Sequence, residues 1–445
     1  MKTPIFDFVK KYAESDSVRL HMPGHKGRAL LGIEAYDITE ISGADALFLA
    51  DGIIKESEDN ASSLFGSHTF YSTEGSSLSI RAMVYLAALY ARDKGREPLM
   101  LATRNVHKSF ISALSLVGCE VSWIDEGERA SYLTSSLTPT MLDSTLEALC
   151  DTVTAVYVTT PDYLGNMLDV EALATVAHKH GALLLVDNAH GAYLRFLPHA
   201  PHPMMLSADM CADSAHKTLP TLTGGAYLHI SKNAPRFLSE SAKDAMSLFA
   251  STSPSYLILA SLDATNGYIS RGYKDKLALK VRKIDKLKSD ISALGYALLS
   301  TEPMKITILA KEYGYTGVEL ADRLLECGIV SEFSDLDYIV LMPSADTGDE
   351  ELDKLLSAFR SVKRKAPIKD GAPEFKMPTL RMTPREAALS PRETLPVDRC
   401  IGRVLAEVTV GCPPAVPIIV SGEEISEETV KVFKYYGITE CTVVK

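Results

Sequence analysis

Residues 182–192 read ALLLVDNAHGA. The stretch begins with an unbroken apolar run, which ends at Asp187. A strand without polar alternation is buried on both faces, as in a parallel sheet covered by helices. Further strands are predicted at 98–103, 119–124 and 153–159, and helices at 74–92, 107–117, 139–149 and 169–180. This alternation predicts an α/β fold, a three-layer α/β/α domain around a mostly parallel sheet.

Four parts are expected along the chain: an N-terminal helix and loop (1–28), a major domain (29–270), a small α+β domain (271–370) and a C-terminal domain (371–445). A helical pattern at 274–294 leads into the small domain, and a Lys/Pro-rich stretch from Lys363 to Pro378 ends it. The elements predicted in the two smaller domains are strands at 305–310, 337–342 and 416–420 and helices at 350–363 and 426–436.

The composition bounds the class of protein. With 46% apolar and 23% charged residues among 445, the chain has the make-up of a globular protein. A net charge of −11 disfavours binding to nucleic acid or to an anionic membrane, because both favour a positive surface. The seven cysteines are scattered without CxxC spacing, and no apolar run is as long as a membrane helix. Since the N-terminus also lacks a signal-peptide pattern, the expected location is the cytoplasm.

Common phosphate and metal motifs are missing from the sequence, which has no GxxxxGK[ST], no GxGxxG after a strand, no HExxH and no EF-hand loop. His199 and His202 lie in a Pro-rich loop, and no metal site is predicted there. The candidate residues lie instead in local segments at the ends of the predicted strands.

Residues 73–77 (TEGSS) open the helix predicted at 74–92. Gly75 lets backbone N–H groups approach an anion, Ser76 and Ser77 offer hydroxyls, and the helix contributes the positive end of its dipole. The segment therefore predicts a phosphate site, although a Ser/Thr N-cap would give the same pattern.

Residues 104–108 (RNVHK) follow the strand predicted at 98–103, at the edge where doubly wound sheets bind ligands. The flat imidazole of His107 is suited to stack on an aromatic cofactor, and a helix-capping loop is the alternative. Asp187, at its strand end, is costly to bury unless it meets a cation such as a protonated ring nitrogen, or else caps a helix.

Lys217 lies in the apolar segment 214–220 (SAHKTLP). Burial and a neighbouring cation would lower the pKa of its amine and make the neutral nucleophile available, whereas a lone lysine is usually a surface residue. Pyridoxal 5'-phosphate requires a phosphate site, a face for its ring, a carboxylate for its ring nitrogen and an amine for its aldehyde. The four segments offer these groups in this order along the chain.

These segments also show a family resemblance. The chain resembles the bacterial ornithine/lysine/arginine decarboxylases of the aspartate-aminotransferase fold (PLP-dependent fold type I), and in particular their short form. The resemblance is carried by Thr3-Pro4, HMPGHK (21–26), RNVHKS (104–109), DNAHGA (187–192), SAHKTLP (214–220), STSPSY (251–256), PPAVP (413–417) and SGE (421–423).

The resemblance implies a role for each candidate residue. Lys217 would hold the coenzyme's aldehyde, Asp187 would pair with the ring nitrogen and His107 would stack on the ring. Phosphate contacts are implied for Gly75, Ser76, Ser77, Ser214 and His216, positions near the ring for Ala189 and His190, and a contact with a neighbouring subunit's phosphate for Thr252 or Ser253. The implied assembly is a homodimer with shared active sites.

Four positions depart from the family's pattern. Glu74 stands where the family has Asn, and Asn188 stands where the short form commonly has an acidic residue. Residues 412–417 read CPPAVP, with Cys412 and Ala415 in place of the usual Tyr and Gly. These changes leave the cofactor chemistry in place and bear on the substrate and on the level of activity.

The expected reaction is decarboxylation of a basic amino acid (arginine, lysine or ornithine) to CO2 and the amine. Asp187 would keep the ring nitrogen charged so that the ring accepts the electron pair, and Lys217 or His216 would return a proton to the α-carbon. Glu423 or Glu424 is a candidate acceptor for the distal cation of the substrate. The alternatives are transamination or elimination with the same cofactor, and a catalytically silent binder of it.

Overall fold

The computed structural model describes residues 1–127, 131–150, 152–374, 376–407 and 414–445. The chain forms two compact units, which are described in turn. Unit 1 comprises Met1–Pro98, Leu149–Val158 and Val170–Lys276, and unit 2 comprises Leu99–Ala148, Thr159–Asp169 and Leu277–Lys445. The domain limits expected at residues 28, 270 and 370 stay predictions.

Unit 1 is made of both strands and helices. Its strands are β1 (His68–Ser72), β4 (Ala155–Thr159), β5 (Leu183–Asp187), β6 (Met210–Asp213) and β7 (Ala226–Ile230). Its helices are α1 (Pro4–Ala13), α2 (Ile53–Phe65), α3 (Gly75–Asp93), α6 (Val170–Lys179), α7 (Ala215–Thr218), α8 (Arg236–Glu240), α9 (Ala242–Ser247) and α10 (Tyr256–Ile269).

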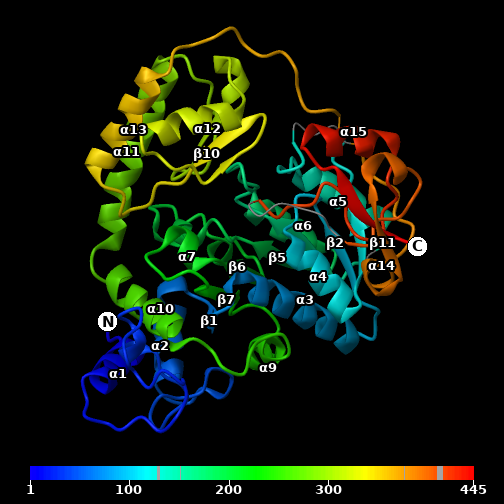
Figure 1. Ribbon diagram of the computed structural model, residues 1–445. Helices are drawn as coiled ribbons and strands as arrows, with labels where there is room; N and C mark the ends of the chain where they lie inside the picture. Colours follow the sequence, from blue (N-terminus) through cyan, green and yellow to red (C-terminus); the bar gives the residue numbers. More distant parts are fainter. Residues whose placement is uncertain (128–130, 151, 375, 408–413) are drawn as a thin grey trace. The chain divides into compact units, whose positions relative to one another are not determined.

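The strands of unit 1 follow the order β1-β7-β6-β5-β4. β5 and β6 are parallel, with Asp187 opposite Ala212, whereas β7 is antiparallel to both β6 and β1. Every residue of β5, β6 and β7 is buried, because helices such as α3 cover the sheet (Figure 1). The unbroken apolar run at 182–187 is thus explained by burial of both faces of its strand.

The start of α1 is fixed by a buried carboxylate. The N–H groups of Ile5 and Phe6 donate to Oδ2 of Asp263 at 2.8 and 2.9 Å, and Ser57 Oγ donates to Oδ1 at 2.5 Å. Two first-turn amides of the helix are satisfied in this way. Ile5 and Val9 are buried, and α1 packs against α2 and α10 (Figure 1).

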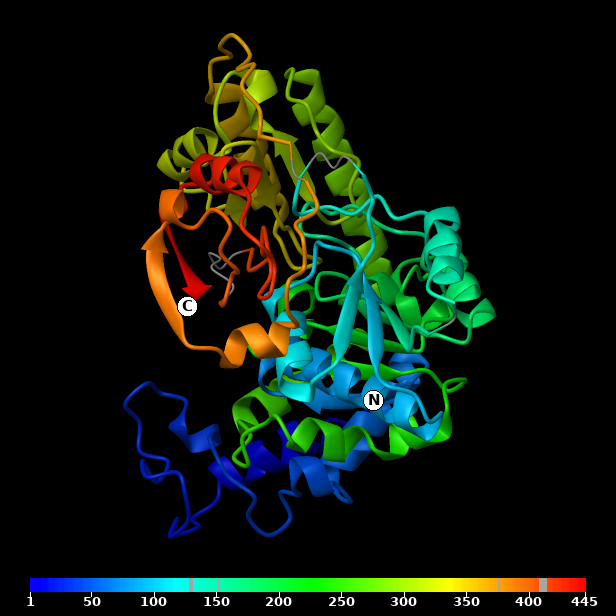
Figure 2. The same cartoon turned by 90° about the vertical axis from the view of Figure 1, so that its right-hand side faces the viewer.

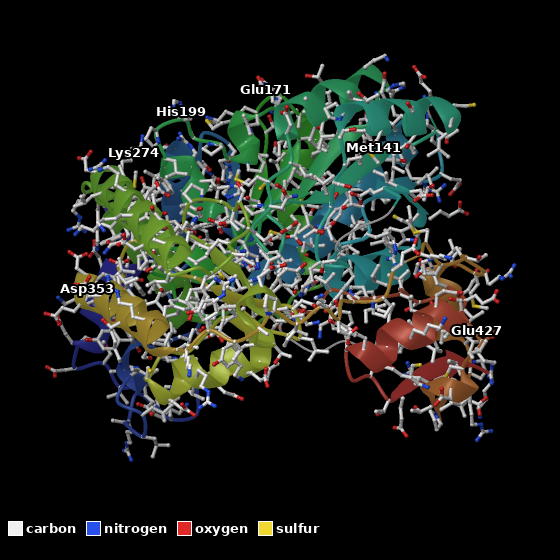
Figure 3. The ribbon with its side chains drawn as sticks, turned by 90° about the horizontal axis from the view of Figure 1, so that it is seen from above. Met141, Glu171, His199, Lys274, Asp353 and Glu427 are labelled. Carbon is white, nitrogen blue, oxygen red and sulfur yellow. The ribbon has the colours of Figure 1, made fainter. Side chains whose placement is uncertain are left out.

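Among the residues that the structure describes, unit 2 contains three groups of strands. The first is a parallel pair, β2 (Leu99–Ala102) and β3 (Glu120–Trp123), and the second is an antiparallel set in the order β8 (Ile306–Leu309), β10 (Tyr338–Leu341), β9 (Phe333–Ser334). The third is an antiparallel pair, β11 (Arg392–Pro396) and β12 (Glu440–Val444), seen in Figure 2. Its helices are α4 (Lys108–Val117), α5 (Pro139–Ala148), α11 (Tyr273–Ala293), α12 (Gly317–Glu326), α13 (Asp349–Ser361), α14 (Pro384–Leu389) and α15 (Glu427–Tyr435). Asp353 of α13 and Glu427 of α15 are exposed (Figure 3).

The strand predicted at 416–420 is wrong. These residues are buried but form a loop. Ile418 O accepts from Arg104 at 3.2 Å, and Val420 N–H donates to Oε2 of Glu423 at 2.7 Å. An apolar run alone does not distinguish a buried strand from a buried loop.

The other predicted helices and strands are present, with ends that differ by a few residues. Within the described residues, no helix combines the length and apolar character needed to cross a lipid bilayer.

Candidate functional site

Asp187 ends strand β5 and is 2% exposed. Its Oδ1 accepts the N–H of Ala189 at 3.1 Å, and its Oδ2 accepts the hydroxyl of Tyr157 at the longer distance of 3.3 Å. Burial raises the pKa of Asp187, and the positive charge of Lys217 partly opposes this. A cationic N–H donor, such as a protonated ring nitrogen, is the partner that would hold this carboxyl in its charged form.

Lys217 lies in the short helix α7, directly after β6. Its side chain is half-buried, and Nζ lies 3.1 Å from Nε2 of His190, which follows β5. Because β5 and β6 are parallel neighbours, their carboxyl ends bring Lys217, His190 and Asp187 to one edge of the sheet. The structure thus joins the predicted amine, carboxylate and ring-side histidine within unit 1.

His216 is held by its backbone and its ring together. Its N–H and its Nδ1 both lie near the carbonyl oxygen of Gly225, at 3.1 and 3.0 Å, so Nδ1–H is the donor. A neutral ring then has no proton on Nε2. His216 therefore donates to a phosphate through Nε2 only as an imidazolium.

The predicted phosphate site forms where α3 begins. Ser214 Oγ donates to Ser76 Oγ at 2.8 Å, which joins two predicted phosphate ligands from distant parts of the sequence. Gly75 has a φ of +70°, and a Cβ there would meet no atom within 4 Å. Its N–H donates to Gly224 O at 2.8 Å, so a phosphate would meet the next amides and hydroxyls, those of Ser76 and Ser77.

The N-cap residue of α3 is Glu74, and its side chain makes no capping hydrogen bond. The Ser/Thr N-cap alternative is therefore wrong here. One carboxylate oxygen of Glu74 instead accepts the N–H of Ser251 at 2.8 Å. This bond lies beside Thr252 and Ser253, which are exposed in the single chain.

His107 is the N-cap residue of α4 in unit 2, so the capping interpretation of this segment is confirmed. Its Nδ1 accepts the N–H of Ser109 at 3.2 Å and lies 2.7 Å from Ser109 Oγ. An accepting Nδ1 places the proton of a neutral ring on Nε2 and fixes the ring's direction. Capping uses only the edge of the ring, so it is compatible with stacking on the ring face.

Asp213, which the sequence analysis missed, is the centre of a fully buried polar cluster. Its Oδ2 accepts from Nε2 of His202 and of His229, at 2.9 and 3.1 Å, and its Oδ1 accepts from Asn188 Nδ2 and Cys211 Sγ, at 2.7 and 3.3 Å. These donors, His202 and His229 foremost, hold the pKa of Asp213 far below its usual range, although burial acts the other way. No strand was predicted at 210–213, so no sequence signal marked Asp213.

His202, Cys211 and Asp213 also lie close enough together to hold a metal ion. Their hydrogen bonds to the Asp213 carboxylate account for this closeness. Asn188, which replaces the acidic residue of the family's pattern, donates its side-chain N–H to the Asp213 carboxylate. A neutral amide can make this hydrogen bond, whereas a second carboxylate could not.

Glu423 is buried and bonded to Arg104, with Oε2 3.0 Å from Nη2. The expectation that it receives the distal cation of a substrate is therefore wrong, because that carboxylate already has a cation. Oε2 of Glu424 accepts from Nε of Arg381 at 2.5 Å, near the surface. Cys412, another departure from the family's pattern, lies outside the described residues.

Comparisons with known proteins bear on the family to which this chain belongs. The family model "Orn/Lys/Arg decarboxylase, major domain" matches residues 3–297, and the model "Orn/Lys/Arg decarboxylase, C-terminal domain" matches residues 372–443. An arginine decarboxylase of Halalkalibacterium halodurans is 30% identical, over 96% of this chain and 91% of the relative. An arginine decarboxylase of Bacillus subtilis is 31% identical, over 97% and 93%.

Among solved structures, the lysine decarboxylase LdcF of Francisella novicida has a TM-score of 0.81 at 17% identity, covering 100% of this chain and 81% of that one. This likeness confirms the predicted fold class. The matched models and the full-length relatives confirm the predicted family: the chain belongs to the Orn/Lys/Arg decarboxylases.

Proposed function

We propose that this protein is a pyridoxal-phosphate-dependent decarboxylase that converts arginine to CO2 and agmatine. The observation that carries the proposal is the grouping of Lys217, His190 and Asp187 at one sheet edge of unit 1. The substrate is inferred from two relatives that align over more than nine-tenths of both chains and are named arginine decarboxylase. Lysine and ornithine are the other basic amino acids to be tested.

Pyridoxal phosphate, when bound, supplies a conjugated ring that accepts the electron pair of the broken bond between the α-carbon and the carboxylate. Lys217 provides the amine that attaches it. Asp187 keeps the ring nitrogen protonated, and the buried surroundings that raise the pKa of Asp187 strengthen that pairing. His107 provides a flat face for the ring, and Ala189 lies beside it.

The phosphate is assigned to Ser76, Ser77, Ser214 and His216, and Gly75, which has no side chain and open space beside it, leaves room for the phosphate at the start of α3. The bond between Ser214 and Ser76 supports this set, because it brings two hydroxyl groups to the beginning of α3. Thr252 is assigned to the phosphate of a partner subunit in a homodimer. The proposed setting is the cytoplasm.

Decarboxylation leaves an electron pair that must take up a proton. Lys217 is the proposed donor to the α-carbon, because its Nζ lies 3.1 Å from Nε2 of His190, which can resupply the proton. His216 suits this role less well, since its Nδ1 is bonded to Gly225 O.

Two measurements on the purified holoenzyme test the proposal. Borohydride trapping followed by peptide mapping should label Lys217, and the Lys217→Ala variant should lose both the label and activity. Lys232→Ala, a change at an exposed lysine, is the matched control and should keep both. A label on another lysine would contradict the assignment.

The second measurement is a product screen with arginine, lysine and ornithine. Release of CO2 and agmatine from arginine is expected. Formation of a keto acid would identify an aminotransferase, and bound coenzyme without turnover of any of the three would identify a silent binder. Either result would overturn the proposal.

A further inference from the structure

The loop that carries His107 is bonded to the C-terminal part of unit 2. Arg104 precedes His107 by three residues, is 1% exposed, and pairs with the fully buried Glu423. Lys108, directly after His107, donates its N–H to the carbonyl oxygen of Ala415 at 2.9 Å. The segment 415–423 therefore holds the loop on both sides of the histidine.

The guanidinium of Arg104 makes further contacts that fix its position. Its Nη2 also donates to Ile418 O at 3.2 Å, and its Cζ lies 4.7 Å from the centre of the Trp123 ring, in strand β3. An arginine that stacks on an aromatic ring and bonds to a carboxylate has little freedom to move. The strand-end loop is thereby anchored to both β3 and segment 415–423.

Glu423 is held equally firmly by a tight turn. Its N–H donates to Val420 O at 3.2 Å, and its Oε2 accepts the N–H of Val420 at 2.7 Å. Gly422 has a φ of +93°, as a turn of this kind requires, and a Cβ there would lie 2.1 Å from Met382 O. The turn 420–423 is built so that the carboxylate is presented to Arg104.

Stability alone does not explain this pair. Nε and Nη1 of Arg104, and both polar side-chain atoms of Asn105, are buried without a hydrogen-bond partner among the described residues. A buried ion pair with unsatisfied donors contributes less to stability than well-packed apolar side chains of the same size. Its position, three residues before a proposed cofactor ligand, indicates another role.

We propose that Arg104 and Glu423 are positioning residues that act through His107, so that the turn 420–423 of the C-terminal domain sets the face presented to the coenzyme ring. The inference rests on the proposed function, since the role of His107 does. Neither residue touches the reacting atoms. The C-terminal domain then contributes to coenzyme binding through the position of His107.

A double-mutant cycle on the full-length protein tests this. The dissociation constant of pyridoxal phosphate and the circular dichroism of its absorption band are measured for the wild type, Glu423→Gln, His107→Ala and the double variant. Glu423→Gln should weaken binding at least about tenfold and change the dichroism, and His107→Ala should do the same. In the His107→Ala background it should have little further effect, because residues that act through one another are not additive.

Glu393→Gln is the matched control, since Glu393 pairs with Arg403 at 2.8 Å at the partly exposed surface of the same domain. It should bind the coenzyme like the wild type. Thermal unfolding of each apoprotein separates folding from positioning. Arg104→Lys, which keeps the charge but not the planar fork, takes the place of Glu423→Gln if that variant does not fold.

Equal weakening by Glu423→Gln in both backgrounds would show that it acts elsewhere and would overturn the inference. So would a lowered unfolding temperature with unchanged affinity and dichroism. A wild type that takes up no coenzyme would instead refute the proposed function, so the two failures are distinguishable.

Discussion

Nζ of Lys217 and Nε2 of His190 lie 3.1 Å apart, although 27 positions separate them in the sequence. Each follows one of two adjacent parallel strands, β6 and β5, so the register of the sheet brings them together. A lysine in hydrogen-bond contact with a histidine can exchange a proton with it. This relationship is the structural basis of the proton transfer proposed above.

His190→Ala should therefore lower kcat for arginine by about a hundredfold, the usual contribution of a positioned acid–base group. Lys217 should still be labelled in borohydride trapping, because its amine remains. His199→Ala, at an exposed loop histidine (Figure 3), is the control and should leave kcat unchanged. An unchanged kcat in His190→Ala would exclude the proposed exchange.

Glu74→Gln should tighten binding of pyridoxal phosphate by about threefold or more, because a negative charge at a helix N-terminus repels a bound phosphate. Glutamine can still accept the Ser251 N–H, so the loop contact is kept. Equilibrium titration measures the affinity. Asp93→Asn, at the other end of α3, should have no effect, and weaker binding by Glu74→Gln would refute the repulsion.

Asp213→Asn should lower the free energy of unfolding at pH 7 by about 3 kcal/mol, since it leaves buried histidine donors without their anion. The pKa of Asp213 is held below its usual value, so its stabilising effect is present above about pH 4 and is lost as the pH falls further. Urea unfolding at pH 7, 5 and 3.5 should show the difference between variant and wild type shrinking at the lowest pH.

The control for that series is Asp59→Asn, which removes an exposed partner of Lys55 and should leave the unfolding midpoint unchanged. A constant difference between Asp213→Asn and the wild type at all three pH values would contradict the assignment of a charged Asp213.

Asp162→Asn should raise the free energy of unfolding above pH 7. Burial raises the pKa of Asp162 to about 7, so the folded state keeps a proton that the unfolded chain loses near its ordinary value of about 4. The wild type therefore loses stability as the pH rises from about 4 to 7, and the variant does not. The gain should be about 1–3 kcal/mol at pH 8, measured by urea unfolding.

The amide oxygen introduced by Asp162→Asn can still accept the N–H of Asn166, which bonds to Oδ1 of Asp162 at 2.9 Å in the wild type. Asp322→Asn, at a surface position of α12, is the control. A gain from Asp162→Asn that is equally large at pH 4 would point to packing and not to the proton.

The sequence by itself determined the α/β fold class and singled out the proposed cofactor residues, but it did not predict strands β1, β6, β7, β9, β11 and β12. Both predictions depend on short stretches of neighbouring residues. An apolar run indicates a buried strand, and a lysine, a strand-end aspartate and a Gly-Ser helix start each indicate one chemical function. The family followed from the same short segments. The loop at 416–420 escaped this reasoning because its backbone bonds to partners far along the chain.

Only the tertiary structure decided which buried charges meet. Arg104 and Glu423 are 319 positions apart, and Asp213 gathers His202, His229 and Asn188 from separate turns and strands. Nothing in the neighbouring residues of Glu423 says whether its carboxylate faces a substrate or an arginine. That depends on where the folded chain excludes water and which opposite charge lies within reach, and this is a property of the path of the chain.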